Sequence, residues 1–270
     1  AIANVPCICY NERMNIPAFL KETPIAHRGL HTDGIPENSL SAFEEAVRHG
    51  YAIETDVRFT KDKKLVIFHD DNVDRMTDAS GEVSAFPLQA LRELYLEGTQ
   101  ERIPLFSECL ETIAGKAPLL LEVKDMPGVS GKEIAEAIYA EIAKFPALEY
   151  AVQSFQPAYP TAYKKLCPAI ACGMLGIDKD YKKEDFHNSP LWRIKAKLLP
   201  DICYRTAKKL DFISYYCGNY PSDKLRAYRG VKLAWTVRSP EEAERLRPFA
   251  DNIIFEGFLP ALPSEDCSNR

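Results

Sequence analysis

The chain has 270 residues, and its 34 Lys and Arg against 39 Asp and Glu give a formal net charge of −5 at pH 7. That acidic balance argues against sequence-independent binding to nucleic acid. A hydrophobic content of 46% and a charged content of 27% are ordinary for a folded globular protein and exclude a disordered chain. The sequence contains no run of 18 apolar residues, so we expect no membrane span in this chain.

The eight cysteines are scattered along the chain and never occur at a C-x-x-C spacing, which argues against a structural zinc site. Small secreted scaffolds use cysteine far more densely, so we expect reduced thiols and a cytoplasmic location. Charged residues, among them Glu12 and Arg13, interrupt any signal-peptide core in positions 1–23. Because the chain begins with Ala1, a targeting segment or membrane anchor upstream stays open.

Short β-rich runs alternate with amphipathic stretches from residue 24 onward, a pattern typical of a parallel α/β protein. The expected strands are Pro24–His27, Ala52–Val57, Leu119–Val123, Tyr150–Ser154, Ala169–Leu175, Phe212–Tyr216, Leu233–Val237 and Asn252–Phe255. The expected helical segments are Ser39–His49, Gly131–Phe145, Pro157–Leu166, Pro221–Tyr228 and Pro240–Phe249. Ser39 and Ser239 stand at expected helix N-caps, and Pro240 at the first helical position strengthens the second start.

Eight strands with intervening helices predict a (β/α)₈ TIM-type barrel, while periodicity leaves a doubly wound open sheet as the alternative. One segment departs from the alternation. Residues 61–64 form a polar turn between Thr55–Thr60 and Leu65–His69 that is too short for a helix, so the two stretches must pair as an antiparallel hairpin. No linker or repeat divides the chain, and we expect one domain.

Acidic residues gather at the expected strand ends. Glu54 and Asp56 lie two positions apart on the second strand, as Glu122 and Lys124 do on a later one, so each pair points to one side. Glu54, Asp56 and Glu122 aimed into one barrel mouth would repel one another without a cation among them. Ligation by oxygen alone suits one divalent cation, Mg²⁺ or Ca²⁺. The alternative is that each acid is solvated or paired with a nearby Arg or Lys.

The chain has five histidines, of which two lie where a reaction could use them. His27 ends the first strand and His69 stands at the return of the hairpin. Phosphodiester cleavage needs one group that accepts a proton and another that donates one, which two imidazoles can supply. His31 in the next loop could contact a ligand, whereas His49 at a helix end and His187 in a charged loop are more simply structural or solvated.

Positive and aromatic side chains are expected near the same mouth. Arg28 offers a planar fork that matches phosphate oxygens, and Lys124 offers a point charge. Neutralising a neighbouring acid is the alternative role for each of them. Trp235 lies near the end of another strand, where a core position is its commonest use and a wall for the organic part of a substrate is the other.

An ordered set of motifs carries a family resemblance. The motifs are His27-Arg28-Gly29, Pro36-Glu37-Asn38-Ser39, Glu54-x-Asp56, His69-Asp70, Ile103-Pro104, Glu122-x-Lys124, Gln153-Ser154-Phe155 and Trp235-Thr236-Val237. With them, the chain from Pro24 to about Phe258 resembles the glycerophosphodiester phosphodiesterase family. The resemblance implies a TIM-type barrel in residues 24–270 with a small insertion at about residues 70–97. Residues 1–23 would be an N-terminal arm outside it.

The resemblance also implies the chemistry. One divalent metal would be bound by Glu54, Asp56 and Glu122, and His27 and His69 would form the general acid–base pair. Arg28 would lie on the phosphate with Lys124 close by. The substrate would be a small-molecule glycerophosphodiester, hydrolysed to glycerol 3-phosphate and an alcohol. The glycerol 2-hydroxyl would attack phosphorus to give a cyclic phosphate that water then opens, and its tether favours that attack.

Two other functions stay open at this stage. One is a lipid-directed phospholipase or lyase of the same superfamily that stops at the cyclic phosphate, and the other is a non-catalytic binder of phosphate ligands. The chain departs from the family pattern at Glu256-Gly257, where a Thr-Asp pair is commoner, in the loop Leu30–Ile35, and in the long basic stretch Asp178–Leu199. These departures bear on the head group rather than on the metal and histidine set.

Overall fold

The computed structural model describes residues 16–178, 181–183, 186 and 188–262. Within that part of the chain, eight parallel strands surround a common axis: β1 (Ile25–Ala26), β2 (Ala52–Phe59), β4 (Leu119–Val123), β5 (Tyr150–Ser154), β6 (Ala171–Gly176), β7 (Phe212–Tyr216), β8 (Val231–Val237) and β9 (Asn252–Phe255). The sheet closes because β1 pairs in parallel with both β2 and β9. The TIM-type barrel is therefore confirmed, and the open sheet is excluded.

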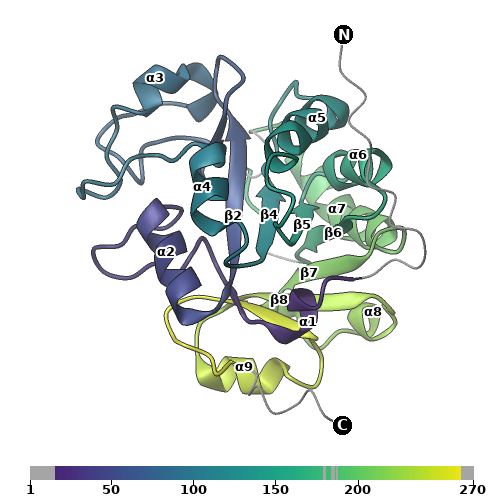
Figure 1. Ribbon diagram of the computed structural model, residues 1–270. Helices are drawn as coiled ribbons and strands as arrows, with labels where there is room; N and C mark the ends of the chain where they lie inside the picture. Colours follow the sequence, from purple (N-terminus) through teal and green to yellow (C-terminus); the bar gives the residue numbers. More distant parts are fainter. Residues whose placement is uncertain (1–15, 179–180, 184–185, 187, 263–270) are drawn as a thin grey trace.

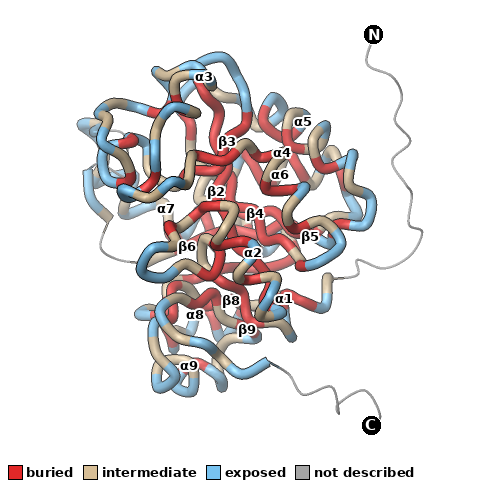
Figure 2. Tube along the Cα trace, turned by 60° about the vertical axis from the view of Figure 1, so that its left-hand side comes forward, coloured by how far each residue is buried: buried red, intermediate tan, exposed pale blue. Residues whose placement is uncertain are grey.

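Helices cover the outside of this barrel (Figure 1). They are α2 (Leu40–His49), α4 (Phe106–Ile113), α5 (Gly131–Ile142), α6 (Ala158–Leu166), α7 (Trp192–Ala207), α8 (Asp223–Arg226) and α9 (Pro240–Leu246). Figure 2 shows buried residues along the strands and exposed residues on the outer sides of the helices. The expected N-caps are confirmed, since the side chains of Ser39 and Ser239 accept hydrogen bonds from the amides of Ala42 and Glu242.

Besides the four-residue helices α1 (Phe19–Glu22) and α3 (Leu88–Leu91), two longer helices were not predicted, α4 and α7. Both begin after a leucine that has no side-chain oxygen to cap the helix, so the usual start signal is absent from the sequence. Helix α7 also contains Pro200, a residue that normally argues against a helix interior. The long basic stretch noted before Leu199 thus includes the first half of α7.

The hairpin is confirmed: β2 pairs antiparallel with β3 (Leu65–Ile67), with Val57 opposite Ile67. The chain then leaves the barrel for residues 70–105, which we call the β3–α4 excursion; it holds a short 3₁₀ helix (Val83–Ala85) and α3 (Leu88–Leu91). Its apolar side chains Val73, Met76, Val83, Leu91, Leu96 and Ile103 pack with Val66 and Phe68, from β3 and the residues just after it, in a cluster separate from the main core. The excursion, bounded by β3 and α4, ends at residue 105, whereas the expected insertion ends near residue 97.

Helix α1 (Phe19–Glu22) packs against residues near the starts of the barrel strands. Phe19 and Leu20 are buried in one cluster with Ile25, Leu120, Phe212 and other residues near the starts of the strands. The amide of Asn252 on β9 donates hydrogen bonds to the carbonyl oxygens of Phe19 at 3.0 Å and Thr23 at 2.7 Å. The end of the arm is therefore part of the core, while residues 1–15 lie outside the described part.

Replacing Phe19 with alanine should lower the free energy of unfolding by about 3–5 kcal/mol, because it removes a buried ring and leaves a cavity. Urea denaturation of the full chain measures this loss. Alanine at Leu259, whose side chain is 60% exposed, is the matched control and should change stability by less than about 0.5 kcal/mol. An equal effect of the two substitutions would show that α1 does not contribute to the core.

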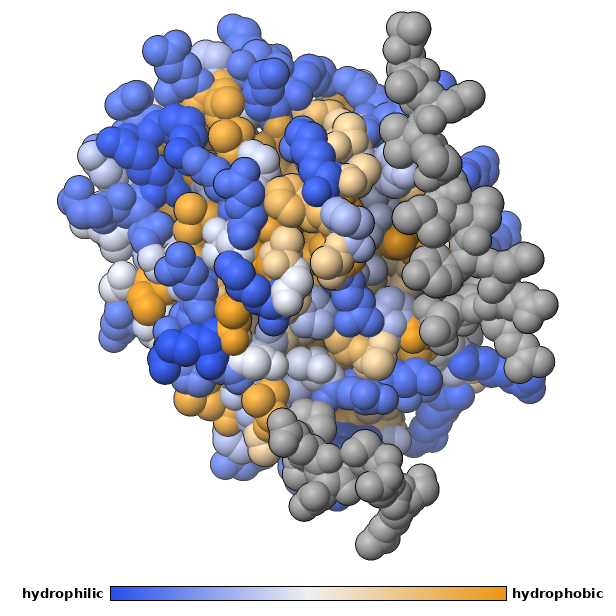
Figure 3. Space-filling view, viewed as in Figure 1, coloured by the Kyte–Doolittle hydropathy of each residue, from blue (hydrophilic) through white to orange (hydrophobic). Residues whose placement is uncertain are grey.

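None of the described helices combines the length and apolarity that crossing a bilayer requires. Five cysteines in the described part are free and buried, whereas Cys7, Cys9 and Cys267 lie outside it. On the face shown in Figure 3, hydrophilic residues predominate and hydrophobic ones appear in small groups.

Candidate active site

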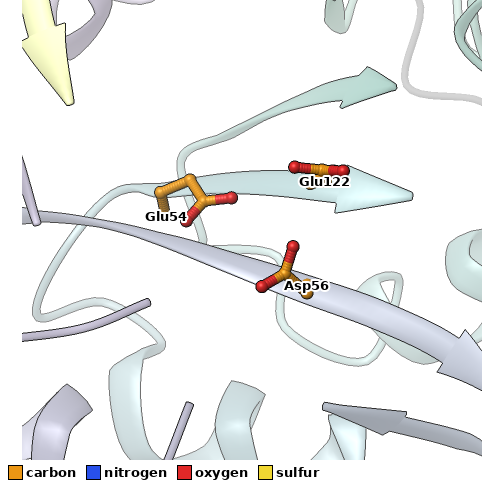
Figure 4. Close-up of side chains that lie close together, drawn as sticks. All are labelled: Glu54, Asp56 and Glu122. Atoms are coloured by element: carbon orange, nitrogen blue, oxygen red, sulfur yellow. The ribbon is translucent and has the colours of Figure 1, made fainter. Parts of the chain in front are cut away.

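Three carboxylates from neighbouring strands meet inside the barrel. Glu54 and Asp56 lie on β2, Glu122 lies on β4, and Asp56 is directly opposite Glu122 in the parallel register. One carboxylate oxygen of each lies within 4.8 Å of the others, and all three residues are buried. Figure 4 shows the side chains turned toward the space between the two strands. The alternation of residues along β2 thus brings the predicted acids together.

The cluster is rich in negative charge. Burial raises the pKa of Glu54 well above its ordinary value, and the charges of Asp56 and Glu122 raise it further. Burial also raises the pKa of Glu122, although Lys124 opposes that rise. For Asp56 burial acts in the same direction, but Lys124, His69 and Arg28 together outweigh it and hold the pKa far below its usual range.

The cations that were expected at the phosphate pair with these acids in the structure. The Lys124 Nζ lies 2.7 Å from a Glu122 oxygen and 3.4 Å from Asp56 Oδ1. The Arg28 guanidinium donates to Glu37 at 2.8 Å and lies 3.5 Å from Asp56 Oδ2. Both cations therefore stand beside the acidic cluster, where a phosphate oxygen could replace a carboxylate as their partner.

The loop from β1 to α2 orients the cluster. Arg28 has a φ of 57°, a left-handed conformation that points its backbone amide at Glu54 Oε2, 3.1 Å away. Asn38, with a φ of 55°, donates through Nδ2 to Asp56 Oδ2 at 2.9 Å. At Gly29, an added Cβ would lie 2.9 Å from the carbonyl carbon of Ala42, so only glycine fits between the loop and α2.

A carboxylate that sequence reasoning missed holds His27. The Nδ1 of His27 lies 2.6 Å from Glu256 Oε2, directly after β9, and Arg238 donates to the other oxygen of Glu256 at 2.6 Å. Burial lowers the pKa of His27, and the bond to Glu256 works against that decrease. His31 lies near the same carboxylate, with its Nε2 at 4.0 Å. The departure from the family pattern at Glu256 therefore supplies the partner of His27, and the expectation that it does not bear on the histidine set was wrong.

Replacing Glu256 with glutamine should lower the pKa of His27, because the neutral amide removes a charge that favours the imidazolium. The kcat should fall about 10- to 100-fold if His27 must keep one tautomer for proton transfer. An NMR titration of the histidine rings measures the first effect, and kinetics the second. An unchanged His27 titration would contradict the positioning role of Glu256. Replacing exposed Glu244 in the same way is the control.

His69 has an equivalent partner. Its Nδ1 lies 2.6 Å from Asp70 Oδ1, and Arg75 donates to the other oxygen of Asp70 at 2.6 Å. Arg75 also donates to Glu37, which accepts from Arg28 as well, so ion pairs connect the β3–α4 excursion to the β1–α2 loop. Burial, together with the charge of Lys124, lowers the pKa of His69 to about 4. In each ring a carboxylate thus holds Nδ1.

A cavity of about 640 Å³ opens beside the cluster. Its polar lining includes His69, Glu122 and Lys124, and its apolar lining includes Phe155, Ile177, Tyr181, Leu199 and Trp235. Trp235 is fixed by a hydrogen bond from Nε1 to the carbonyl oxygen of Ser214 and by an edge contact with Phe155. Trp235 therefore forms part of the wall. His27 does not line this cavity; its ring lies next to Arg28, within electrostatic reach of Asp56.

The remaining histidines lie away from the cluster or outside the described part. His49 at the end of α2 contacts the carbonyl oxygen of Glu45 at 3.0 Å, as a helix-terminal residue would. His187 lies outside the described residues.

The chain matches a known protein family over most of its length. The sequence model of the glycerophosphoryl diester phosphodiesterase family matches residues 27–255, most of the chain. The chain belongs to this family. Members with similar sequences include the YhdW protein of Bacillus subtilis (strain 168), 37% identical over 56% of the chain, and a glycerophosphodiester phosphodiesterase of Caldanaerobacter subterraneus, 33% identical over 58%. These matches cover 64% and 67% of the two relatives.

Solved structures of the same family share the barrel. A phosphodiesterase of Oleispira antarctica, determined in complex with the product sn-glycerol-3-phosphate, has a TM-score of 0.68 and 26% identity. The match covers 86% of the chain described here and 91% of the Oleispira antarctica chain. A second structure, from Silicibacter pomeroyi, has a TM-score of 0.70 at 21% identity over 87% of the chain and supports the fold alone.

Proposed function

We propose that the chain hydrolyses glycerophosphodiesters to glycerol 3-phosphate and an alcohol. The observation that carries the proposal is the cluster of Glu54, Asp56 and Glu122, with its carboxylate oxygens within 4.8 Å of one another beside a cavity that His69 lines. Family membership supports it, as does the Oleispira antarctica relative, whose structure holds sn-glycerol-3-phosphate as its product.

The acidic cluster fits a hard divalent cation. Its donors are all carboxylate oxygens, and the buried Asp56 Oδ1 makes no hydrogen bond among the described residues, although the Lys124 ammonium lies 3.4 Å from it. Burial and mutual repulsion raise the pKa of Glu54, the result expected for carboxylates that lack sufficient positive charge. We therefore assign Glu54, Asp56 and Glu122 as ligands of Mg²⁺ or Ca²⁺. Bound there, the cation would lower the pKa of the substrate hydroxyl and offset charge on the phosphate.

We assign proton transfer and phosphate binding to side chains of the protein. His27 and His69 form the acid–base pair: one accepts the proton of the glycerol 2-hydroxyl, and the other donates a proton to the departing alcohol oxygen. Glu256 and Asp70 hold Nδ1 of the two rings, which fixes the orientation of each imidazole. Arg28 and Lys124 bind phosphate oxygens as the charge on them grows. Attack by the tethered hydroxyl gives a cyclic phosphate, which water opens to glycerol 3-phosphate.

A time course followed by phosphorus NMR tests this proposal. Glycerophosphocholine, incubated with the protein and Mg²⁺ or Ca²⁺, should disappear while the signal of glycerol 3-phosphate grows, with the cyclic phosphate present only transiently. A cyclic phosphate that accumulates and persists would assign the chain to the lyase alternative instead. If no diester is consumed although the protein binds glycerol 3-phosphate, the chain is a binder and the proposal is wrong.

A further inference from the structure

Arg58 is a buried cation on β2 that the proposed reaction does not use. It lies two residues beyond Asp56, and only 7% of its surface is exposed. Because side chains alternate along a strand, Glu54, Asp56 and Arg58 belong to the same side of β2. The strand therefore carries the two proposed metal ligands and this arginine at successive positions. A buried charge is costly unless specific partners satisfy it, so its partners indicate what the arginine does.

The guanidinium group of Arg58 binds the backbone of His69. Its Nε donates to the carbonyl oxygen of His69 at 3.0 Å, and its Nη2 donates to the same oxygen at 2.6 Å. Nη2 also lies 2.7 Å from Asp71 Oδ1. One planar side chain thus holds the residues on both sides of Asp70. The fixed fork of an arginine suits this arrangement, whereas a lysine offers only a point charge.

The β2–β3 ladder does not extend to His69. Strand β3 ends at Ile67, and the next backbone hydrogen bond runs from the amide of Phe68 to the carbonyl oxygen of Asp56 at 3.0 Å. Within the described residues, no backbone amide donates to the carbonyl oxygen of His69. The side chain of Arg58 therefore takes the place of the ladder bond that would otherwise attach this residue to β2.

The position of the His69 ring depends on this backbone attachment. The Nδ1 of the ring bonds to Asp70, the next residue in the chain, so the ring and that carboxylate move together when the turn shifts. Arg75 joins the carboxylate to another loop, whereas Arg58 joins the turn to the strand of the metal ligands. A displacement of about 1 Å between reacting groups can lower a rate about 100-fold.

We propose that Arg58 is a positioning residue that sets the distance between the His69 ring and the metal ligands on β2. The inference rests on the proposed hydrolase function. Arg58 transfers no proton and acts through the carbonyl oxygen of His69. Its removal leaves the proposed phosphate-binding cations, Arg28 and Lys124, in place, so the effect falls on kcat rather than on KM.

Kinetics with glycerophosphocholine and Mg²⁺ or Ca²⁺ test this role. Arg58→Ala should lower kcat about 10- to 100-fold and change KM by less than about threefold. Guanidinium ion at millimolar concentration should restore part of the rate, because it can bind in the space that the side chain leaves. Arg58→Lys should lose an intermediate amount, since an ammonium supplies the charge without the fork.

Arg92 provides a matched control. It also donates to a backbone carbonyl oxygen and to a carboxylate, those of Ile103 and Glu108, but it does not line the cavity. Arg92→Ala should keep kcat within about twofold of wild type, even if it lowers stability.

The NMR signals of the His69 ring test the attachment without any need for turnover. With metal present, the wild-type ring should give one sharp set of signals, and Arg58→Ala should give a broadened or doubled set. The signals of His49 should stay unchanged in both proteins. Asp71→Asn keeps the arginine but removes one of its partners, so it should give a smaller change of the same kind. This variant decides the question if Arg58→Ala does not fold.

Three results would overturn the positioning role. A higher KM at unchanged kcat would place Arg58 on the substrate instead. Equal losses of kcat in Arg58→Ala and Arg92→Ala would reduce its role to general stability. Unaltered His69 signals in Arg58→Ala would show that the ring does not depend on it. If the wild type consumes no diester, the hydrolase proposal fails, and the ring signals alone then decide whether Arg58 holds His69.

Discussion

Addition of EDTA should reduce turnover of glycerophosphocholine to background, and excess Mg²⁺ or Ca²⁺ should restore it. The reason is that Glu54, Asp56 and Glu122 are buried together, and Lys124 neutralises only part of their charge. On the proposed function, the substrate hydroxyl would keep a high pKa without a dication, and Arg28 and Lys124 alone would offset the charge on the phosphate. The measurement is the initial rate at each stage of chelation and re-addition. Full activity in EDTA would contradict the metal site.

The ligand set can be tested separately from the rate. Glu54→Gln replaces an anionic donor with a neutral amide of similar shape, so the affinity for Mg²⁺ or Ca²⁺ in calorimetry should fall by at least about tenfold. Glu37→Gln is a useful comparison, since Glu37 is also acidic and near the site but binds Arg28 and Arg75 instead. Equal losses of affinity in the two variants would show that the cation does not bind where we place it.

His69→Ala should lower kcat by about 10²–10⁴-fold, the usual contribution of a group that transfers a proton. The ring lines the cavity beside Lys124, and burial lowers its pKa to about 4, so it is neutral over the physiological range. Because the Nδ1–H of the neutral ring donates to the Asp70 carboxylate, Nε2 is unprotonated and can accept a proton. Kinetics under saturating substrate and metal measure the loss.

Two controls make the result at His69 specific. His49→Ala removes a ring at the end of α2, distant from the cavity lining, and should leave kcat within about twofold of wild type. Unchanged thermal stability of His69→Ala would exclude misfolding as the cause. A loss of less than tenfold would assign His69 to structure and leave proton transfer to another group.

The sequence was sufficient for the parts of the fold that depend on local pattern. Strands β4, β5, β7 and β9 were predicted to the residue, because short buried runs are bounded by clear turns. The hairpin followed from the four-residue turn alone. The convergence of Glu54 and Asp56 followed from the alternation of side chains along β2. Helices α4 and α7 were missed because neither has a polar N-cap residue.

The partners of the site residues could not be read from the sequence. Glu256 stands 229 positions from His27, and only the closure of β1 on β9 brings them together. The sequence held two signals at Glu256: its position directly after an expected strand, where barrel enzymes carry functional residues, and the departure from the family pattern there. Arg28 and Lys124 were correctly placed near the acids, but which carboxylate each would bind depends on loop conformation and strand register.

The ion pairs around Arg75 have a consequence for exchanging parts between related barrels. Arg75 lies in the β3–α4 excursion, yet two of its hydrogen bonds go to Glu37 in a loop that another strand carries. If this excursion were grafted onto a different barrel, Arg75, which donates to Asp70, would lose its hydrogen bonds to Glu37. Only a recipient loop with an acid at the same place would restore them. The β3–α4 excursion and the β1–α2 loop therefore form one structural unit. Recombination between homologues should succeed when both segments are exchanged together.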